Sequence, residues 1–233
     1  MTTFQYSSQI LEDFPNLVSG VVVIRNVKND INPDGLEDAY NAEQVAVMAR
    51  IGTKALSEIA SLTAWRKVFR QFGVEPTKYR SAPEALLRRL RKKGYIPHIN
   101  SLVDIGNLIS IRYALPVAIF DTDATNGVIT VRYADGSERY CGLHEKEVHH
   151  PDVGEVIFAD DTGLVVARRW CWRQSAESAA QSRTNNVVIT IEAQHDNSRT
   201  DIQNALNDMI VLLETYIEGE AEHAILDYDN YRI

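Results

Sequence analysis

The sequence has few of the features that mark membrane, secreted and redox proteins. It holds only two cysteines, Cys141 and Cys171, and their spacing fits no zinc or redox motif. This favours a reduced, cytoplasmic protein. No apolar run reaches about 18 residues, so we expect no membrane span. The opening stretch MTTFQYSSQ lacks the basic and apolar parts of a signal peptide.

The common catalytic and nucleotide-binding motifs are also missing. There is no Walker loop, GxGxxG, GxSxG or HExxH. The stretch HEKEVHH places His144, His149 and His150 near two glutamates, but this spacing fits no metal motif. We therefore expect no metal site and no cofactor.

What the sequence does contain is an ordinary globular balance with an uneven charge. It has 233 residues, 45% of them hydrophobic and 24% charged, and a net charge of −8. Residues 66–93 carry ten Lys or Arg against Glu75 and Glu84, so this segment is +8 and the remainder is −16. The acidic total disfavours non-specific nucleic-acid binding, whereas a local basic face suits a phosphate backbone. A simply solvated helix face is the other interpretation.

Apolar spacing predicts four helical regions. A long helical pattern starts near Glu43 and runs to Phe72, and a short basic helix over 83–94 follows, with Ser81 placed to cap it and Gly94 to end it. A third helix is expected over Ser101–Tyr113 and a fourth over about Asp201–Ile217. The tail YDNYRI is expected to be loose or locally docked.

Alternating apolar residues predict strands over most of the rest. An extended segment covers 17–27, and six strands are expected at 117–121, 127–134, 138–143, 154–160, 163–174 and 186–193. This order predicts an α+β fold with a mixed or mostly antiparallel sheet system. We expect one domain over 1–233: an N-terminal strand and helical part (1–76), a strand-rich core (77–195), and a C-terminal helix and tail (196–233).

Two stretches are candidate sites. In the third helix, Asn100, Asp104 and Asn107 share one face. Capping and the helix dipole explain Asn100 and Asp104. Asn107 lies mid-helix without either explanation, so a polar cavity and a structural role stay equally open.

The second candidate is the strand 163–174, which contains ARRWCWRQ. Alternation would place Arg168, Trp170, Trp172 and Gln174 on one face. This mixture suits a small polar ligand or a stacked nucleotide. Arginine stems that cover tryptophan rings are an equally good explanation.

Residues 81–121, SAPEALLRRLRKKGYIPHINSLVDIGNLISIRYALPVAIFD, resemble the B3/B4 domain of the phenylalanyl-tRNA synthetase beta subunit. The family pattern there is roughly SP-x-WL-x-x-RL, a glycine, I-N-N-x-VD-x-TN-Y-x-M, and G-x-P-x-H-x-FD. The matching residues are Ser81, Pro83, Leu86, Leu90, Gly94, Ile99, Asn100, Val103, Asp104, Asn107, Pro116, Phe120 and Asp121. The likeness continues more weakly to about residue 194, and the stretch 77–195 is the B3/B4-like core.

The resemblance implies a β-sandwich-like core flanked by helices, and an editing site that hydrolyses tyrosine wrongly attached to the phenylalanine tRNA. Three positions depart from the pattern. Ala118 stands where the family has a pocket histidine, Gly106 replaces a threonine, and a glycine pair is replaced within 170–174. These departures predict a reshaped pocket. They leave open which amino acid is accepted and whether the site cleaves or only binds.

We therefore expect a trans-editing hydrolase that deacylates mischarged aminoacyl-tRNA. Asn107 and Asp104 would be its catalytic residues, and Asn107→Ala should abolish deacylation without unfolding the protein. The residues expected to contact the substrate are Asn100, Arg168, Trp170, Trp172 and Gln174. Those expected to contact tRNA are Arg80, Arg88, Arg89, Arg91, Lys92 and Lys93. A non-catalytic module that binds tRNA or an amino acid is the alternative, and an unrelated enzyme acting on a small carboxylate is a third option. The oligomeric state is left open.

Overall fold

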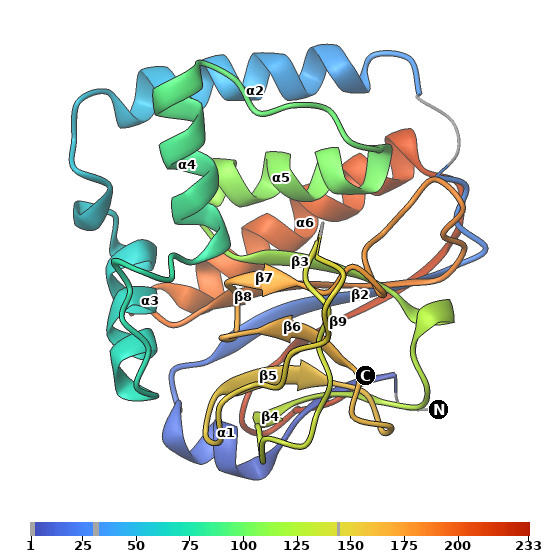
Figure 1. The fold of residues 1–233 in the computed structure, drawn as a ribbon. Coiled ribbons are helices and arrows are strands. Elements are labelled where there is room, and N and C mark those ends of the chain that lie inside the picture. The colour runs from blue at the N-terminus through green and yellow to red at the C-terminus, as the bar shows by residue number, and fades with distance from the viewer. Residues whose placement is uncertain (1–2, 30–32, 144) are drawn as a thin grey trace.

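The computed structural model describes residues 3–29, 33–143 and 145–233. A layer of helices covers one face of a β-sheet, and the other face of that sheet packs against a second sheet (Figure 1). The α+β class and the sandwich-like core flanked by helices are therefore confirmed.

The two sheets differ in how they are built. The first has the strand order β1-β4-β5-β6-β7, with β1 and β4 parallel and the other neighbours antiparallel; the second is antiparallel, in the order β3-β8-β2-β9. The strands of the first sheet are β1 (Phe4–Tyr6), β4 (Ile129–Tyr133), β5 (Val156–Ala159), β6 (Val165–Arg168) and β7 (Arg173–Gln174). Those of the second are β3 (Val117–Asp121), β8 (Val187–Ala193), β2 (Val18–Arg25) and β9 (Glu220–Leu226).

The helices α2, α4, α5 and α6 contribute to the core above the second sheet, and α1 lies beside β4 of the first (Figure 1). The helices are α1 (Ser8–Asp13), α2 (Leu36–Ile51), α3 (Ala60–Gln71), α4 (Ala82–Lys93), α5 (Ser101–Tyr113) and α6 (Ser198–Tyr216). Two short 3-10 turns cover Leu56–Glu58 and Thr122–Ala124.

Strand β8 separates two hydrophobic cores. Its residues Val187, Ile189 and Ile191 belong to the core under the helices, while Val188 belongs to the core between the sheets. Because side chains alternate along a strand, Glu192 lies on the same side as Val188. A carboxylate is therefore placed at the edge of an apolar core.

Helix α5 lies unusually close to β3. A Cβ added to Gly106 would lie 2.8 Å from Cδ1 of Ile119 and 3.4 Å from Cγ1 of Val117. The absence of a side chain at Gly106 lets the helix and strand approach, and α5 thereby supports the strand that carries Val117 and Ala118.

The helix predictions over 83–94 and Ser101–Tyr113 are confirmed to within a residue by α4 and α5, and α6 begins three residues before the predicted start. The predicted long helix is wrong in its continuity, because the chain turns at Gly52 (φ 46°) after α2 and resumes helix only at α3. Ser81 occupies the N-cap position of α4, but its side chain makes no capping hydrogen bond.

Two strand predictions are corrected. Residues 138–143 form only isolated bridges, such as Tyr140 with His149, and residues 163–174 form a hairpin of β6 and β7 instead of one strand. The tail YDNYRI is docked, because the backbones of Phe4 in β1 and Ile233 exchange hydrogen bonds. The strand β9 before it was not predicted, and it pairs with β2 along its length. All three predicted parts of the chain thus supply strands to the second sheet, while their boundaries stay predictions.

Candidate functional site

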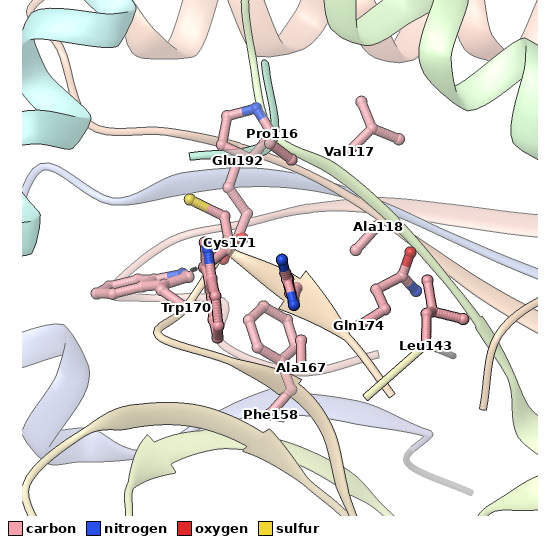
Figure 2. A pocket seen from close by; sticks show the side chains of 13 residues that line it. Pro116, Val117, Ala118, Leu143, Phe158, Ala167, Trp170, Cys171, Gln174 and Glu192 are labelled. Carbon is pink, nitrogen blue, oxygen red and sulfur yellow. Dashed lines mark hydrogen bonds between the residues drawn. The ribbon is translucent and has the colours of Figure 1, made fainter. Parts of the chain in front are cut away.

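A partly open cavity of about 360 Å³ lies where the two sheets meet the start of α4. In Figure 2, Trp170 and Cys171 lie on one side of it, with Gln174 and Leu143 on the other. The lining residues are Ala82, Pro116, Val117, Ala118, Leu143, Phe158, Ala167, Trp170, Cys171, Trp172, Arg173, Gln174 and Glu192. We call this the inter-sheet cavity. Its wall is mostly apolar with a few polar groups, which is typical of a small-molecule site.

Glu192 is the carboxylate of this cavity. Its exposed fraction is 1%, and its Oε1 atom accepts hydrogen bonds from the Tyr6 hydroxyl (2.7 Å) and from Nε1 of Trp170 (2.9 Å). Burial raises the pKa of Glu192 to about 7, although both hydrogen bonds act to lower it. A carboxyl that titrates near neutral pH can exchange a proton with a bound water.

The turn between β6 and β7 decides which side chains reach the cavity. Arg169 and Trp170 both adopt positive φ angles, 44° and 58°, which is uncommon for residues other than glycine. This turn breaks the strand alternation, because Cys171 and Arg173 line the cavity together with Trp170, Trp172 and Gln174. The prediction that one continuous face carries these residues is therefore wrong.

The predicted substrate-binding residues of this hairpin separate into two groups. Trp170, Trp172 and Gln174 line the cavity, and the side-chain amide of Gln174 donates to the backbone oxygen of Ile119 at 2.6 Å. Arg168 is not part of the lining: it is buried and forms a two-point ion pair with Glu155 at 2.9 and 2.7 Å. Its position in a buried ion pair explains how a strand of the sheet holds a charged residue.

Cys171 is the cysteine that lines the inter-sheet cavity. Burial, together with the neighbouring Glu192 carboxylate, raises the pKa of the thiol well above its ordinary value. Since the thiolate is the nucleophile, Cys171 acts here as a small apolar wall residue.

The polar face of α5 is held by structural contacts. Asn100 caps the helix by accepting from the backbone N–H of Val103 (3.1 Å), and its amide donates to the Ala180 oxygen. Asp104 accepts from the backbone N–H of Ile99 (3.0 Å) and contacts His98 Nδ1 (3.1 Å). Burial raises the pKa of Asp104, while these hydrogen bonds oppose the shift.

Asn107 lies beside Tyr40 of α2. Burial raises the pKa of the Tyr40 hydroxyl, the Asp104 carboxylate adds to this rise, and the Asn107 side chain opposes it. None of the three polar α5 residues is among the residues that line the inter-sheet cavity. Their predicted catalytic and substrate-binding roles stay predictions.

The basic helix α4 begins at the cavity and carries its charge away from it. Ala82 lines the cavity and its N–H donates to the Cys171 oxygen. In the first turn, Glu84 is buried between Arg66 and Arg88, at 2.8 and 2.9 Å. Burial acts to raise the pKa of Glu84, but the hydrogen bonds from these arginines outweigh it, and the pKa lies below its usual value.

The residues predicted to contact tRNA differ in how far their side chains are already bound to other groups of the protein. Arg88 pairs with Glu84, Arg80 is 4.0 Å from the same carboxylate, and Arg91 donates to backbone oxygens at Gly52 and Lys54. Arg89 lies over the Tyr95 ring, while Lys92 and Lys93 are exposed at the end of the helix. Their contact with tRNA stays a prediction.

The histidine-rich stretch makes local contacts. His149 lies 3.4 Å from Glu145, and Nδ1 of His150 lies 2.8 Å from the Glu138 oxygen; His144 is outside the described residues. Within the ranges that the structure describes, no three His, Cys, Asp or Glu side chains gather as metal ligands would. Nor does any helix there combine the length and apolar character needed to cross a membrane.

Sequence reasoning missed Glu192, the only carboxylate among the described residues of the cavity wall. A signal was available: in NVVITIEA, strand alternation places Val188, Thr190 and Glu192 on one face. A glutamate on a face shared with core residues indicates a buried acid.

Comparison with protein families matches residues 64–216 to the B3/4 domain. The match covers more than half of the chain, so the chain belongs to the B3/4 domain family, as the resemblance predicted. Its curated relatives include phenylalanine–tRNA ligase beta subunits.

The beta subunit of Neisseria gonorrhoeae is 32% identical over 109 residues, 47% of this chain and 13% of the relative. That of Brucella abortus is 29% identical over 143 residues, 60% of this chain and 17% of the relative. This chain thus spans a small part of these relatives. A crystal structure of an N-terminal fragment of the phenylalanyl-tRNA synthetase beta subunit from Pyrococcus horikoshii aligns with 94% of this chain and 50% of that one, at 14% identity and a TM-score of 0.49.

Proposed function

We propose that this protein is a hydrolase that deacylates mischarged aminoacyl-tRNA in trans, and that the inter-sheet cavity is its active site. The observation that carries the proposal is Glu192, a buried carboxyl with a pKa of about 7 in the wall of a cavity of about 360 Å³. Membership of a family whose relatives include phenylalanine–tRNA ligase beta subunits supports a substrate that carries tRNA.

Hydrolysis of an aminoacyl ester requires a well-positioned water and no strong protein nucleophile, because the ester is already activated. In its ionised form, Glu192 accepts a proton from a water whose oxygen attacks the ester carbonyl carbon. The bond from that carbon to the ribose oxygen then breaks, and the leaving oxygen takes the proton back from Glu192. The products are the free amino acid and the uncharged tRNA.

The cavity wall supports an amino acid with an apolar or mixed side chain. Phe158, Ala118 and Ala167 offer small or aromatic apolar surface, and Trp172 closes part of the wall. Gln174 is the polar group opposite Trp170 (Figure 2). The accepted amino acid is left open.

The basic helix supports contact with the tRNA backbone. Lys92 and Lys93 lie at the end of a 12-residue helix whose first residue lines the cavity, which places them about 16 Å along its axis. A tRNA with its charged end in the cavity would bring its acceptor phosphates past these cations. We place this activity in the cytoplasm, where charged tRNAs are used.

In this proposal, the residues singled out by the family resemblance support the site and do not take part in the reaction. Asp104 and Asn107 lie on α5 and Asn100 caps it. This helix packs against β3 at Gly106 and so supports one wall of the cavity. Arg168 holds the hairpin through Glu155. Direct participation of these residues in catalysis is the sequence-based alternative to a Glu192-centred mechanism.

A module that binds the charged end without cleaving it is the second candidate. The observation that favours it is the cavity wall itself, where Ala118 stands at the position of the family's histidine and the Cys171 thiol has a raised pKa. In this case Glu192 would contribute to recognition only.

The test is to incubate the purified protein with a panel of mischarged tRNAs and to follow ester loss. The hydrolase predicts accelerated ester loss for at least one member of the panel. Protected ester with measurable tRNA binding would replace the hydrolase by the binding module, and the absence of tRNA binding at moderate salt would contradict both.

A further inference from the structure

Cations and aromatic rings alternate in a row that begins at the cavity. The guanidinium of Arg173 lies 4.6 Å from the centre of the Trp172 ring, and that of Arg169 lies 4.8 Å from the same ring. Arg169 is also 4.0 Å from the Tyr79 ring, over which Lys78 Nζ lies at 4.9 Å. We call these five residues the cation–aromatic row.

The row joins two segments that are far apart in the sequence. The Tyr79 and Trp172 rings meet edge to face at 5.0 Å, and the N–H of Ala82 donates to the Cys171 oxygen at 2.8 Å. Trp172 and Arg173 line the inter-sheet cavity, whereas Tyr79 does not. The row therefore starts at the wall of the cavity and leads away from it.

The centre of the row is fixed and its outer parts are accessible. Arg169 is buried and held by Asp152 (3.5 Å) and Glu155 (3.6 Å), so it orders the two rings on either side. The Arg173 side chain is 54% exposed. Tyr79 and Trp172 are partly exposed. A row whose rings are already ordered loses little side-chain entropy when a ligand stacks on it.

The charge beside the row is positive in excess. Lys78 forms no ion pair with the residues that the structure describes. Arg80 shares the single carboxylate of Glu84 with Arg66 and Arg88. Anionic groups that follow the row would therefore meet uncompensated cations at its outer end.

We propose that the cation–aromatic row is the docking site for the unpaired 3′ nucleotides of the tRNA. This inference rests on the proposed function and names the part of the substrate that the row holds. The bases stack on the rings of Tyr79 and Trp172 and on the guanidinium plane of Arg173, and the phosphates contact the cations of Lys78 and Arg80. The terminal ribose then reaches the cavity with its ester.

Because the bases bind by stacking, the site does not need hydrogen bonds that distinguish one base from another. Aromatic rings and guanidinium planes stack on any base, and this is the usual way that proteins hold unpaired RNA. All tRNAs end in the same unpaired CCA sequence. A row that holds this end lets the cavity alone select the amino acid.

The test uses the RNA trinucleotide CCA as the probe and tryptophan fluorescence as the signal. Trp65 and Trp170 are fully buried, so a stacked base should quench mainly Trp172. Saturable quenching by CCA is expected, with loss of the signal in Trp172→Phe. A trinucleotide without bases, which keeps the phosphates, should quench far less. Equal binding of the two probes, or quenching that survives in Trp172→Phe, would overturn the proposal.

Substitutions at Tyr79 give a second measurement, by fluorescence anisotropy of labelled CCA. Tyr79→Ala should weaken binding about 10-fold, the usual effect of losing one stacking ring, while Tyr79→Phe should stay within about twofold. Tyr95→Ala is the matched control, because Tyr95 is an exposed tyrosine beside Arg89 at the far end of α4. An equal loss in Tyr79→Ala and Tyr95→Ala would contradict the assignment.

Two assays separate this inference from the proposed function. If both are right, Tyr79→Ala raises KM for mischarged tRNA but leaves the hydrolysis of a small aminoacyl ester unchanged. CCA binding without any deacylation would support the docking site and contradict the proposed hydrolase activity. Deacylation by a protein that does not bind CCA would support the hydrolase activity and contradict the docking site.

Discussion

Two regions of this protein each hold a buried carboxylate, Asp104 on α5 and Glu192 in the inter-sheet cavity, and they differ in what surrounds it. On α5, Asp104 accepts a hydrogen bond from the backbone of Ile99 and contacts the His98 ring, and Asn107 lies beside Tyr40 of α2. In the inter-sheet cavity, Glu192 receives both of its hydrogen bonds at Oε1, among the described residues, and it is one of the residues that line the cavity.

The difference shows what separates a structural polar cluster from a candidate active site. The hydrogen bonds of Asn100 and Asp104 to nearby backbone groups hold the start of α5, which explains why these poor helix-forming residues are tolerated there. A buried carboxyl that borders a cavity costs stability and gains a pKa near neutrality. We therefore propose a catalytic role for Glu192 and a structural role for the polar face of α5.

The largest expected effect comes from Glu192→Gln. Glutamine keeps an oxygen acceptor for Tyr6 and Trp170 but cannot accept a proton from water, so the deacylation rate should fall by at least about 100-fold. Single-turnover rates with a mischarged tRNA give the measurement. Asp161→Asn, an exposed change outside the cavity, is the control, and a rate loss of similar size in both variants would contradict the assignment.

The charge of α4 should affect affinity more mildly. Replacing Arg89 and Lys92 by glutamine should weaken tRNA binding several-fold and make the salt dependence of log K shallower by about 1.5, because each lost phosphate contact contributes about 0.7–0.9. The measurement is a binding titration at several salt concentrations. Arg199→Gln, an exposed change in α6, should leave the slope unaltered. An unchanged slope in the double variant would remove α4 from the interface.

The same glutamate should make stability depend on pH. Its pKa is about 7 in the folded protein and 4.5 in the unfolded chain, so the unfolded chain ionises first as pH rises. Stability contributed by this group falls between about pH 4.5 and 7, by roughly 3 kcal/mol in all, and stays low above pH 7. Thermal melts from pH 5 to 8 should show Glu192→Gln gaining stability relative to the original protein. A constant difference over this range would contradict the raised pKa.

The smallest effects are expected at α5. Asn107→Ala should lower the free energy of unfolding by about 1 kcal/mol or less, because the neighbouring Tyr40 hydroxyl makes no hydrogen bond with the described residues, and should leave deacylation within a few-fold. Loss of deacylation with intact stability is the opposite outcome, the one that the family resemblance predicts.

The contact between α5 and β3 gives a matched variant. Gly106→Thr restores the family's residue and forces Ile119 to move, which should cost about 1–3 kcal/mol of stability. Denaturant unfolding measures the loss. A stability unchanged by the threonine would mean that α5 and β3 are not held at this close distance.

Much of the architecture could be predicted from the sequence. Local signals mark α4 through Pro83 and Gly94, and α5 through the Asn100 cap. Alternation located β3 and β8. The charged stretch EAEHAIL gave no such signal, because β9 is an exposed edge strand whose place depends on β2. Its pairing partner lies almost 200 residues away.

The site was harder to predict from the sequence than the fold, for a physical reason. The hairpin turn has positive φ angles at Arg169 and Trp170, and neither residue type indicates such a conformation. Glu192 can be recognised as a buried acid only in the folded protein, where Tyr6 of β1 and Trp170 of the hairpin turn bond to it. Local polarity drew attention to Asn107, whereas burial, which depends on the whole fold, singles out Glu192.

The most direct test compares the two regions in one experiment. The original protein, Glu192→Gln and Asn107→Ala are incubated side by side with a mischarged tRNA that the original protein deacylates, and the remaining ester is followed over time. The account predicts that Asn107→Ala keeps most of the activity and that Glu192→Gln loses it. Full activity in Glu192→Gln, with loss in Asn107→Ala, would contradict the account.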